Sequence, residues 1–178
     1  MGKPHREPLT WEVRRSVGRH DLADPYEGAP MAYDPASPVM TEIEQRRLET
    51  GISWQKLADH IDRPLVWTVA AMLGSHPMPK AEAGAVGELL GLSPETVAAL
   101  QRQPYRTENP ALLSDPTIYR FVELINVYGP AFKALIHEEF GDGIMSAINC
   151  NVNFERRADP NGDRVVVTID GKFLPYHW

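Results

Sequence analysis

The charged residues best placed to do chemistry lie in an apolar stretch, residues 116–128. Its side chains are apolar on nearly every side, and its only charges are Arg120 and Glu123. Residues three apart lie on the same side of a helix, so these two can form an ion pair. Two interpretations stay open: a salt bridge that anchors an interface, or a fixed cation in a partly dry pocket that suits a small anion.

A second candidate group follows at residues 141–146, which read GDGIMS. Its two glycines let backbone N–H groups approach an anion closely, and the hydroxyl of Ser146 follows three residues after the second glycine. The alternative is a helix C-cap followed by a tight turn. Further along, Asn149, Asn151 and Asn153 alternate with apolar residues, so their three amides lie on one face of a strand. The plain explanation of this pattern is a polar face exposed to solvent.

Other kinds of site find little support. No two of the six histidines are spaced three or four apart, so no helix face offers a zinc pair. The one cysteine, Cys150, excludes an internal disulfide and a thiolate zinc site, and it makes a reducing cytoplasm the default location. A Ser-His-Asp triad stays open, although the chain has no G-x-S-x-G, P-loop or dinucleotide motif. We therefore expect no metal and no cofactor.

Composition sets the class of protein. The chain has 178 residues, 43% hydrophobic and 24% charged, which is typical of a globular protein of one domain or two small ones. A net charge of −6 argues against nucleic acid and anionic membranes as partners. No apolar run approaches the roughly 20 residues that span a bilayer, and the N-terminus lacks the apolar core of a secretory signal.

Two regions precede the candidate site. Residues 1–40 hold six of the 16 prolines and lack periodicity, which predicts an extended arm without chemistry, although its Trp11, Tyr26 and Tyr33 could pack elsewhere. Residues 41–106 predict a bundle of short helices, with Ser53 and Ser93 as N-caps. Short helices joined by brief turns are typical of helix-turn-helix, repressor-like bundles.

A DNA-reading role for this bundle is the rival function. Its candidate recognition helix, residues 63–73, offers Arg63 and Thr68 and is otherwise mostly apolar. Base readout needs several Arg, Asn, Gln or Lys side chains. The sequence thus favours a structural bundle, while a non-catalytic DNA-binding or interaction protein remains the alternative.

Residues 107–178 predict the region that holds both candidate groups. Asp115 caps a helix through Tyr128, Gly129-Pro130 breaks or kinks it, and a second helix covers 131–140. Alternation predicts strands at 148–154 and 164–169, with turn signals at 159–162 and 170–171. The fold class is therefore α+β. Since a two-stranded hairpin is marginal alone, we expect another subunit to complete this region as an intertwined dimer.

These elements together resemble the cyanase (cyanate hydratase, or cyanate lyase) family. The resemblance is carried by DPTIYRFVELINVYGPAFKALIHEEFGDGIMSAIN at 115–149, by DGKFLPY at 170–176 and, less distinctively, by SWQKLADHIDRPLVWTVAAMLG at 53–74. It spans roughly residues 41–178 and leaves the arm outside.

The resemblance implies a reaction and a site. Members of that family combine cyanate with bicarbonate to give carbamate, which decomposes to ammonia and carbon dioxide, and a second carbon dioxide. Their active-site Arg, Glu and Ser match Arg120, Glu123 and Ser146 here. No metal or organic cofactor is implied. Family members are homodecamers of five intertwined dimers with sites where several subunits meet, so the resemblance implies a homo-oligomer here.

Overall fold

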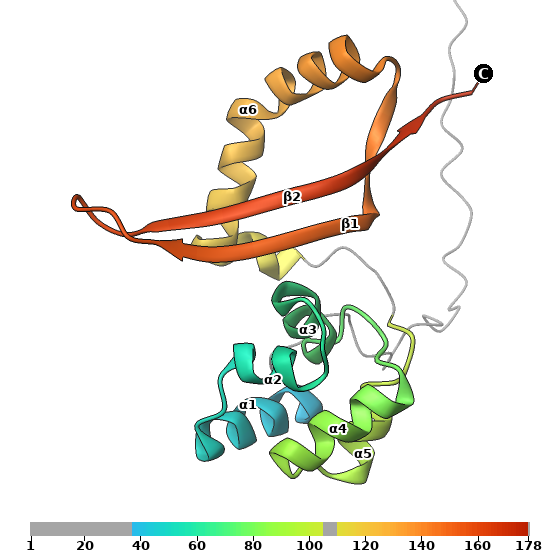
Figure 1. The fold of residues 1–178 in the computed structure, drawn as a ribbon, viewed down its shortest axis with the longest axis vertical. Coiled ribbons are helices and arrows are strands. Elements are labelled where there is room, and N and C mark those ends of the chain that lie inside the picture. Colours follow the sequence, from blue (N-terminus) through green and yellow to red (C-terminus); the bar gives the residue numbers. More distant parts are fainter. Residues whose placement is uncertain (1–36, 105–109, 178) are drawn as a thin grey trace, which may run out of the picture.

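The computed structural model describes residues 37–104 and 110–177, which form a helical bundle followed by a long helix and a β-hairpin (Figure 1). The predicted α+β class is confirmed. Helix α3 is the part of the bundle that contacts strand β1. Most of the predicted arm (1–36) and part of the linker (105–109) lie outside the described residues, as do Trp11, Tyr26 and Tyr33.

The bundle consists of five short helices: α1 (Pro38–Thr50), α2 (Trp54–His60), α3 (Leu65–Met72), α4 (Lys80–Leu90) and α5 (Pro94–Ala99). Serine hydroxyls cap three of them. Ser53 and Ser93 accept the backbone N–H three residues on, as the sequence predicts. Ser37 caps α1 in the same way, so this helix begins at Pro38, a few residues before the predicted start at 41.

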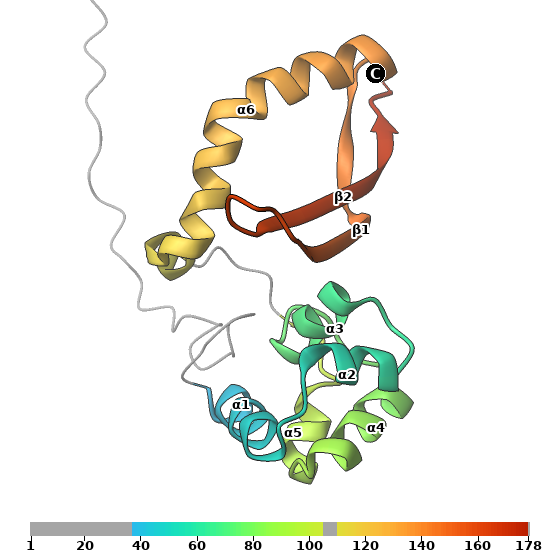
Figure 2. The same cartoon turned by 60° about the vertical axis from the view of Figure 1, so that its left-hand side comes forward.

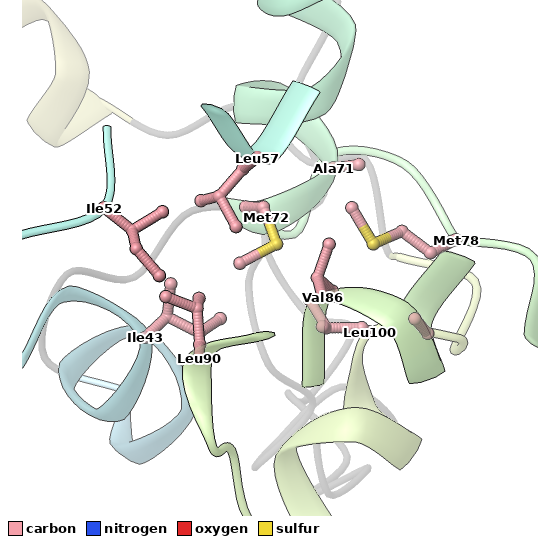
Figure 3. Close-up of a cluster of buried hydrophobic side chains, with 10 residues drawn as sticks. Ile43, Ile52, Leu57, Ala71, Met72, Met78, Val86, Leu90 and Leu100 are labelled. Atoms are coloured by element: carbon pink, nitrogen blue, oxygen red, sulfur yellow. The ribbon is translucent and has the colours of Figure 1, made fainter. Parts of the chain in front are cut away.

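One apolar cluster holds the bundle together (Figure 3). Every helix or its flanking turn contributes to it, and most of its side chains are fully buried. The members are Ile43, Ile52, Leu57, Ala71, Met72, Met78, Ala83, Val86, Leu90 and Leu100. The bundle therefore has a closed core of its own.

A polar contact joins the first and last helices of the bundle. The carboxylate of Glu42, on α1, accepts hydrogen bonds from the Ser93 backbone N–H at 2.6 Å and the Ser93 hydroxyl at 2.7 Å. It also accepts a bond from the Thr96 hydroxyl on α5. These bonds, from Thr96 above all, hold the pKa of Glu42 below its ordinary value, because they stabilise the charged form.

The second part begins with a short 3-10 helix, η1 (Pro110–Ser114), and one long helix, α6 (Pro116–Phe140). Of the two alternatives expected at Gly129-Pro130, a break or a kink, the kink is observed, because Pro130 lies inside α6; the expected separate helix at 131–140 is part of the same element. An interior proline removes one backbone hydrogen bond and bends a helix without having to end it. Figures 1 and 2 show α6 changing direction about halfway along. The Asp115 carboxylate caps its start, as predicted.

The hairpin pairs β1 (Gly143–Arg157) with β2 (Arg164–Pro175) in a two-stranded antiparallel sheet. Both strands are longer than the predicted 148–154 and 164–169. Residues 170–171, expected as a turn, instead pair inside the sheet with Asn151 and Cys150. The backbone of β1 is irregular between Met145 and Cys150, where the register shifts, and the two strands pair on both sides of this irregularity.

The helix and hairpin leave much apolar surface uncovered. No residue of α6 is buried, and Phe121, Val127 and Leu135 are 51%, 67% and 62% exposed. On the hairpin, Ile148 and Val165 are 81% and 70% exposed. A helix that is apolar nearly all round is ordinarily buried, so this part of the chain has the surface of an interface rather than of a finished monomer. Among the described helices, none is long and apolar enough to cross a membrane.

Candidate active site

The first component of the site lies near the start of α6. Arg120 and Glu123 form the ion pair that their spacing predicts. The Arg120 side chain is 72% exposed and the Glu123 side chain is 43% exposed. The described residues of one chain therefore do not enclose this pair, as a dry anion pocket would require.

The second component is Ser146, in the irregular part of β1. The residue is only 9% exposed, and its hydroxyl oxygen accepts hydrogen bonds from the backbone N–H groups of Ile148 at 3.2 Å and Asn149 at 2.9 Å. The hydroxyl is thus held in a fixed position by the strand around it. The GDGIMS segment and the family resemblance both pointed to this residue, whereas its fixed geometry comes from the fold.

The glycines before Ser146 have structural roles. Gly141, with φ of 87°, is the C-cap of α6. Gly143 is the first residue of β1, and a Cβ there would lie 2.5 Å from the Leu174 carbonyl oxygen. Of the two interpretations of this segment, the C-cap is the one observed. Asn149, Asn151 and Asn153 are exposed along β1, in agreement with the plain polar face.

No contact between the described residues joins Ser146 to Arg120 or Glu123. Arg120 precedes the end of α6 by 20 residues (140 − 120), about 30 Å of helix. Figures 1 and 2 show β1 starting at the far end of α6 and running back from it before the strand bends. Within one chain, the described residues therefore show no hydrogen bond or ion pair that links Ser146 to the Arg120–Glu123 pair.

The structure also accounts for both polar residues of the rival DNA-reading helix. Thr68 is fully buried, and its hydroxyl donates to the Pro64 carbonyl. Arg63 forms a fork of hydrogen bonds with Glu82 and stacks on the ring of Trp67. Because both side chains have partners within the bundle, the helix offers little for base readout. In the described part of the chain, no cluster of three or more His, Cys, Asp or Glu could hold a metal ion.

Two family models match the chain, one over each of the two parts that the structure shows. The model described as "Cyanate hydratase, N-terminal" matches residues 38–104, and the model described as "Cyanate lyase C-terminal domain" matches residues 110–178. The first match contains the bundle, and the second contains α6 and the hairpin with all three candidate residues.

Individual proteins match over the same length. The cyanate hydratase of Mycolicibacterium vanbaalenii is 60% identical over 138 residues, which cover 77% of this chain and 90% of that relative. The cyanate hydratase of Ralstonia pickettii is 52% identical and covers 75% of this chain and 92% of the relative. Among solved structures, the crystal structure of cyanase from T. urticae superposes with a TM-score of 0.70 at 36% identity, covering 77% of this chain and 96% of that one.

Proposed function

We propose, from the premise that the chain belongs to the cyanate hydratase (cyanase) family of lyases, that it uses bicarbonate to decompose cyanate to ammonia and carbon dioxide through carbamate. Cyanate hydratase function rests on relatives that are up to 60% identical. The bicarbonate requirement, the site residues and the assembly are the finer parts of the proposal.

We assign the chemistry to Arg120, Glu123 and Ser146. The observation that carries this assignment is the Arg120–Glu123 ion pair, set in a helix whose other side chains are mostly apolar. Cyanate and bicarbonate are both anions, and two unit charges about 4 Å apart repel by about 4 kcal/mol at an effective dielectric constant near 20. A permanently charged guanidinium offsets that repulsion, and its planar fork can bind two oxygen atoms at once.

The two neighbours of Arg120 have different roles in this proposal. Glu123 orients the guanidinium through the ion pair. Ser146 stabilises the joined substrates by hydrogen bonding. The addition of cyanate to bicarbonate also consumes one proton before carbamate and carbon dioxide separate, and a second proton releases ammonia and carbon dioxide from carbamate. The assignment leaves the route of these protons open and involves no metal or organic cofactor.

We also propose that the active protein is a homo-oligomer built from dimers, with a decamer as the family's form. The exposed apolar side chains of α6 support a shared interface, and the lack of a hydrogen bond between the described Ser146 and Arg120 side chains is in line with a shared site. We propose a cytoplasmic location, which suits the free thiol of Cys150. No nucleic acid or membrane partner enters the proposal.

The test is ammonia release from cyanate by the purified full chain, with bicarbonate present and with bicarbonate removed by degassing at controlled pH. We expect rapid release only when bicarbonate is present. No release under either condition would refute the function. Equal release under both conditions would refute the bicarbonate requirement alone.

A further inference from the structure

The irregular part of β1 is an unusually large bulge, which we call the Ser146 bulge (residues 146–149). Met145 pairs with Phe173 and Cys150 pairs with Gly171, so residues 146–149 on β1 face the single residue Lys172 on β2. Ordinary bulges place two residues opposite one and already bend the strand. Figures 1 and 2 show β1 bending sharply partway along its length.

The bulge determines what the Ser146 hydroxyl can do. A serine hydroxyl has two lone pairs that accept hydrogen bonds and one proton that it donates. Both lone pairs are occupied, because the oxygen accepts the backbone N–H groups of Ile148 and Asn149. No hydrogen bond from the Ser146 hydroxyl to another described residue is present. Its remaining capacity is therefore to donate one hydrogen bond, which suits a negatively charged group.

The opposite strand leaves room for this arrangement at Gly171. A Cβ built on Gly171 would lie 2.5 Å from Cγ of Met145 and 2.8 Å from the backbone carbonyl oxygen of Ser146. Gly171 is not among the residues with positive φ, so the requirement is for space rather than for backbone freedom. The clash includes a backbone atom, which no side-chain rotation can relieve. An alanine at this position must therefore change the backbone spacing between β2 and the Ser146 bulge, and we expect the bulge to shift.

We propose that Gly171 is a positioning residue: by leaving space for the Ser146 bulge, it holds the Ser146 hydroxyl where the proposed function needs a hydrogen-bond donor to the anionic adduct of the two substrates. This inference rests on the proposed function and extends it. Donors fixed before the reaction stabilise developing negative charge without reorganisation, and small displacements of such groups are costly. The residue pair is spread over two strands, so sequence spacing gives no sign of it.

A double-mutant cycle tests the coupling between the two residues. The proteins are wild type, Ser146→Ala, Gly171→Ala and the double variant, and the readout is kcat/KM for cyanate at saturating bicarbonate. We expect Ser146→Ala to lose about 100-fold to 1,000-fold, as for removal of one fixed donor. We expect Gly171→Ala to lose roughly tenfold or more. In the Ser146→Ala background, the Gly171 change should cost less than about twofold, because the donor it positions is absent.

The matched control is Gly84→Ala, the same chemical change in α4 at a position where a Cβ meets nothing within 4 Å. It should keep wild-type activity. Near-normal activity of Gly171→Ala, or losses that simply multiply in the double variant, would overturn the positioning role. Failure of Gly171→Ala to fold or assemble would also overturn it, since Gly171 would then be a structural residue.

The donor role has its own test. After denaturing quench during turnover, peptide mapping should find no carbamoyl ester on Ser146. A stoichiometric ester there, or a loss near a millionfold in Ser146→Ala, would make Ser146 a nucleophile and overturn the inference. These outcomes are separable from failure of the proposed function, because that failure is already visible as absent ammonia release by the wild type.

Discussion

At the scale of single residues, the proposed site depends on the contrast between a charged pair and its apolar surroundings. Arg120 is well exposed in one chain, where water screens its charge and weakens its attraction for an anion. In the proposed oligomer, neighbouring chains would remove water from the same guanidinium and make it a strong anion binder, because electrostatic interactions strengthen as the dielectric constant falls. Its geometry then matters as much as its charge.

Arg120→Lys tests that geometry. The substitution keeps the positive charge but loses the planar fork, so we expect a large fall in kcat/KM, about 10-fold to 1,000-fold, with assembly unchanged. The measurements are ammonia release and sedimentation. Arg156→Lys is the control, since Arg156 forms an exposed ion pair with Asp163 at the far end of the hairpin, and it should behave as wild type. Near-normal turnover by Arg120→Lys would remove this residue from the site.

At the scale of elements, a set of hydrogen bonds joins the first and last helices of the bundle. Glu42 connects α1 to the start of α5 through hydrogen bonds to Ser93 and Thr96. The hydrophobic cluster fixes how the helices pack, while this carboxylate fixes the position of α5 relative to α1. The contact is strongest while Glu42 is charged, which links the stability of the bundle to pH.

Glu42→Gln tests the pH link. The folded pKa of Glu42 lies below its ordinary value of 4.5, so the charged form contributes stability above that value. This contribution disappears as the pH falls through the folded pKa. We expect Glu42→Gln to lose about 1–3 kcal/mol of stability at neutral pH, and the difference from wild type to shrink in acid. Urea unfolding between pH 7 and pH 3 measures it, and a difference that stays constant across this range would contradict the argument.

At the scale of the whole molecule, the two parts of the chain differ in how complete they are. The bundle encloses its own apolar core, whereas α6 contains no buried residue. Many exposed large apolar side chains on one helix and hairpin indicate an interface. Assembly would therefore complete the fold of the second part and, at the same time, the proposed site.

Subunit mixing tests this link between assembly and activity. We expect the protein to sediment as a multiple of a dimer at micromolar concentration. We also expect mixtures of Arg120→Ala and Ser146→Ala subunits, each strongly impaired alone, to regain part of the wild-type activity, because a shared site can draw one intact residue from each variant. Each variant mixed with itself is the control. A fully active monomer, or no recovery after verified subunit exchange, would refute a shared site.

A pair of truncations tests the role of the N-terminal segment. The sequence predicts that removal of residues 1–40 leaves activity intact, but α1 begins at Pro38 and is capped by Ser37. We therefore expect removal of residues 1–36 to leave activity and melting temperature close to wild type. Removal of residues 1–40 should lower stability by about 1 kcal/mol, the usual cost of losing an N-cap. Loss of assembly after removal of residues 1–36 would assign these residues a role in the oligomer.

The sequence by itself determined the local features of this protein. Serine caps, proline positions and apolar spacing predicted the bundle helices, and the spacing of Arg120 and Glu123 predicted their ion pair. These features depend on residues within one or two helical turns of each other, which is the range that sequence patterns report. The family could be identified because its motif is one continuous stretch.

Only the tertiary structure decided the features that depend on distant residues. Pro130 bends α6 instead of ending it, since a bent helix keeps most of its hydrogen bonds. Gly171 pairs with Cys150 inside the sheet instead of forming a turn. The Ser146 hydroxyl is fixed as a donor because β1 bulges against β2. Strand register is a relation between two segments, so no pattern within either segment could reveal it.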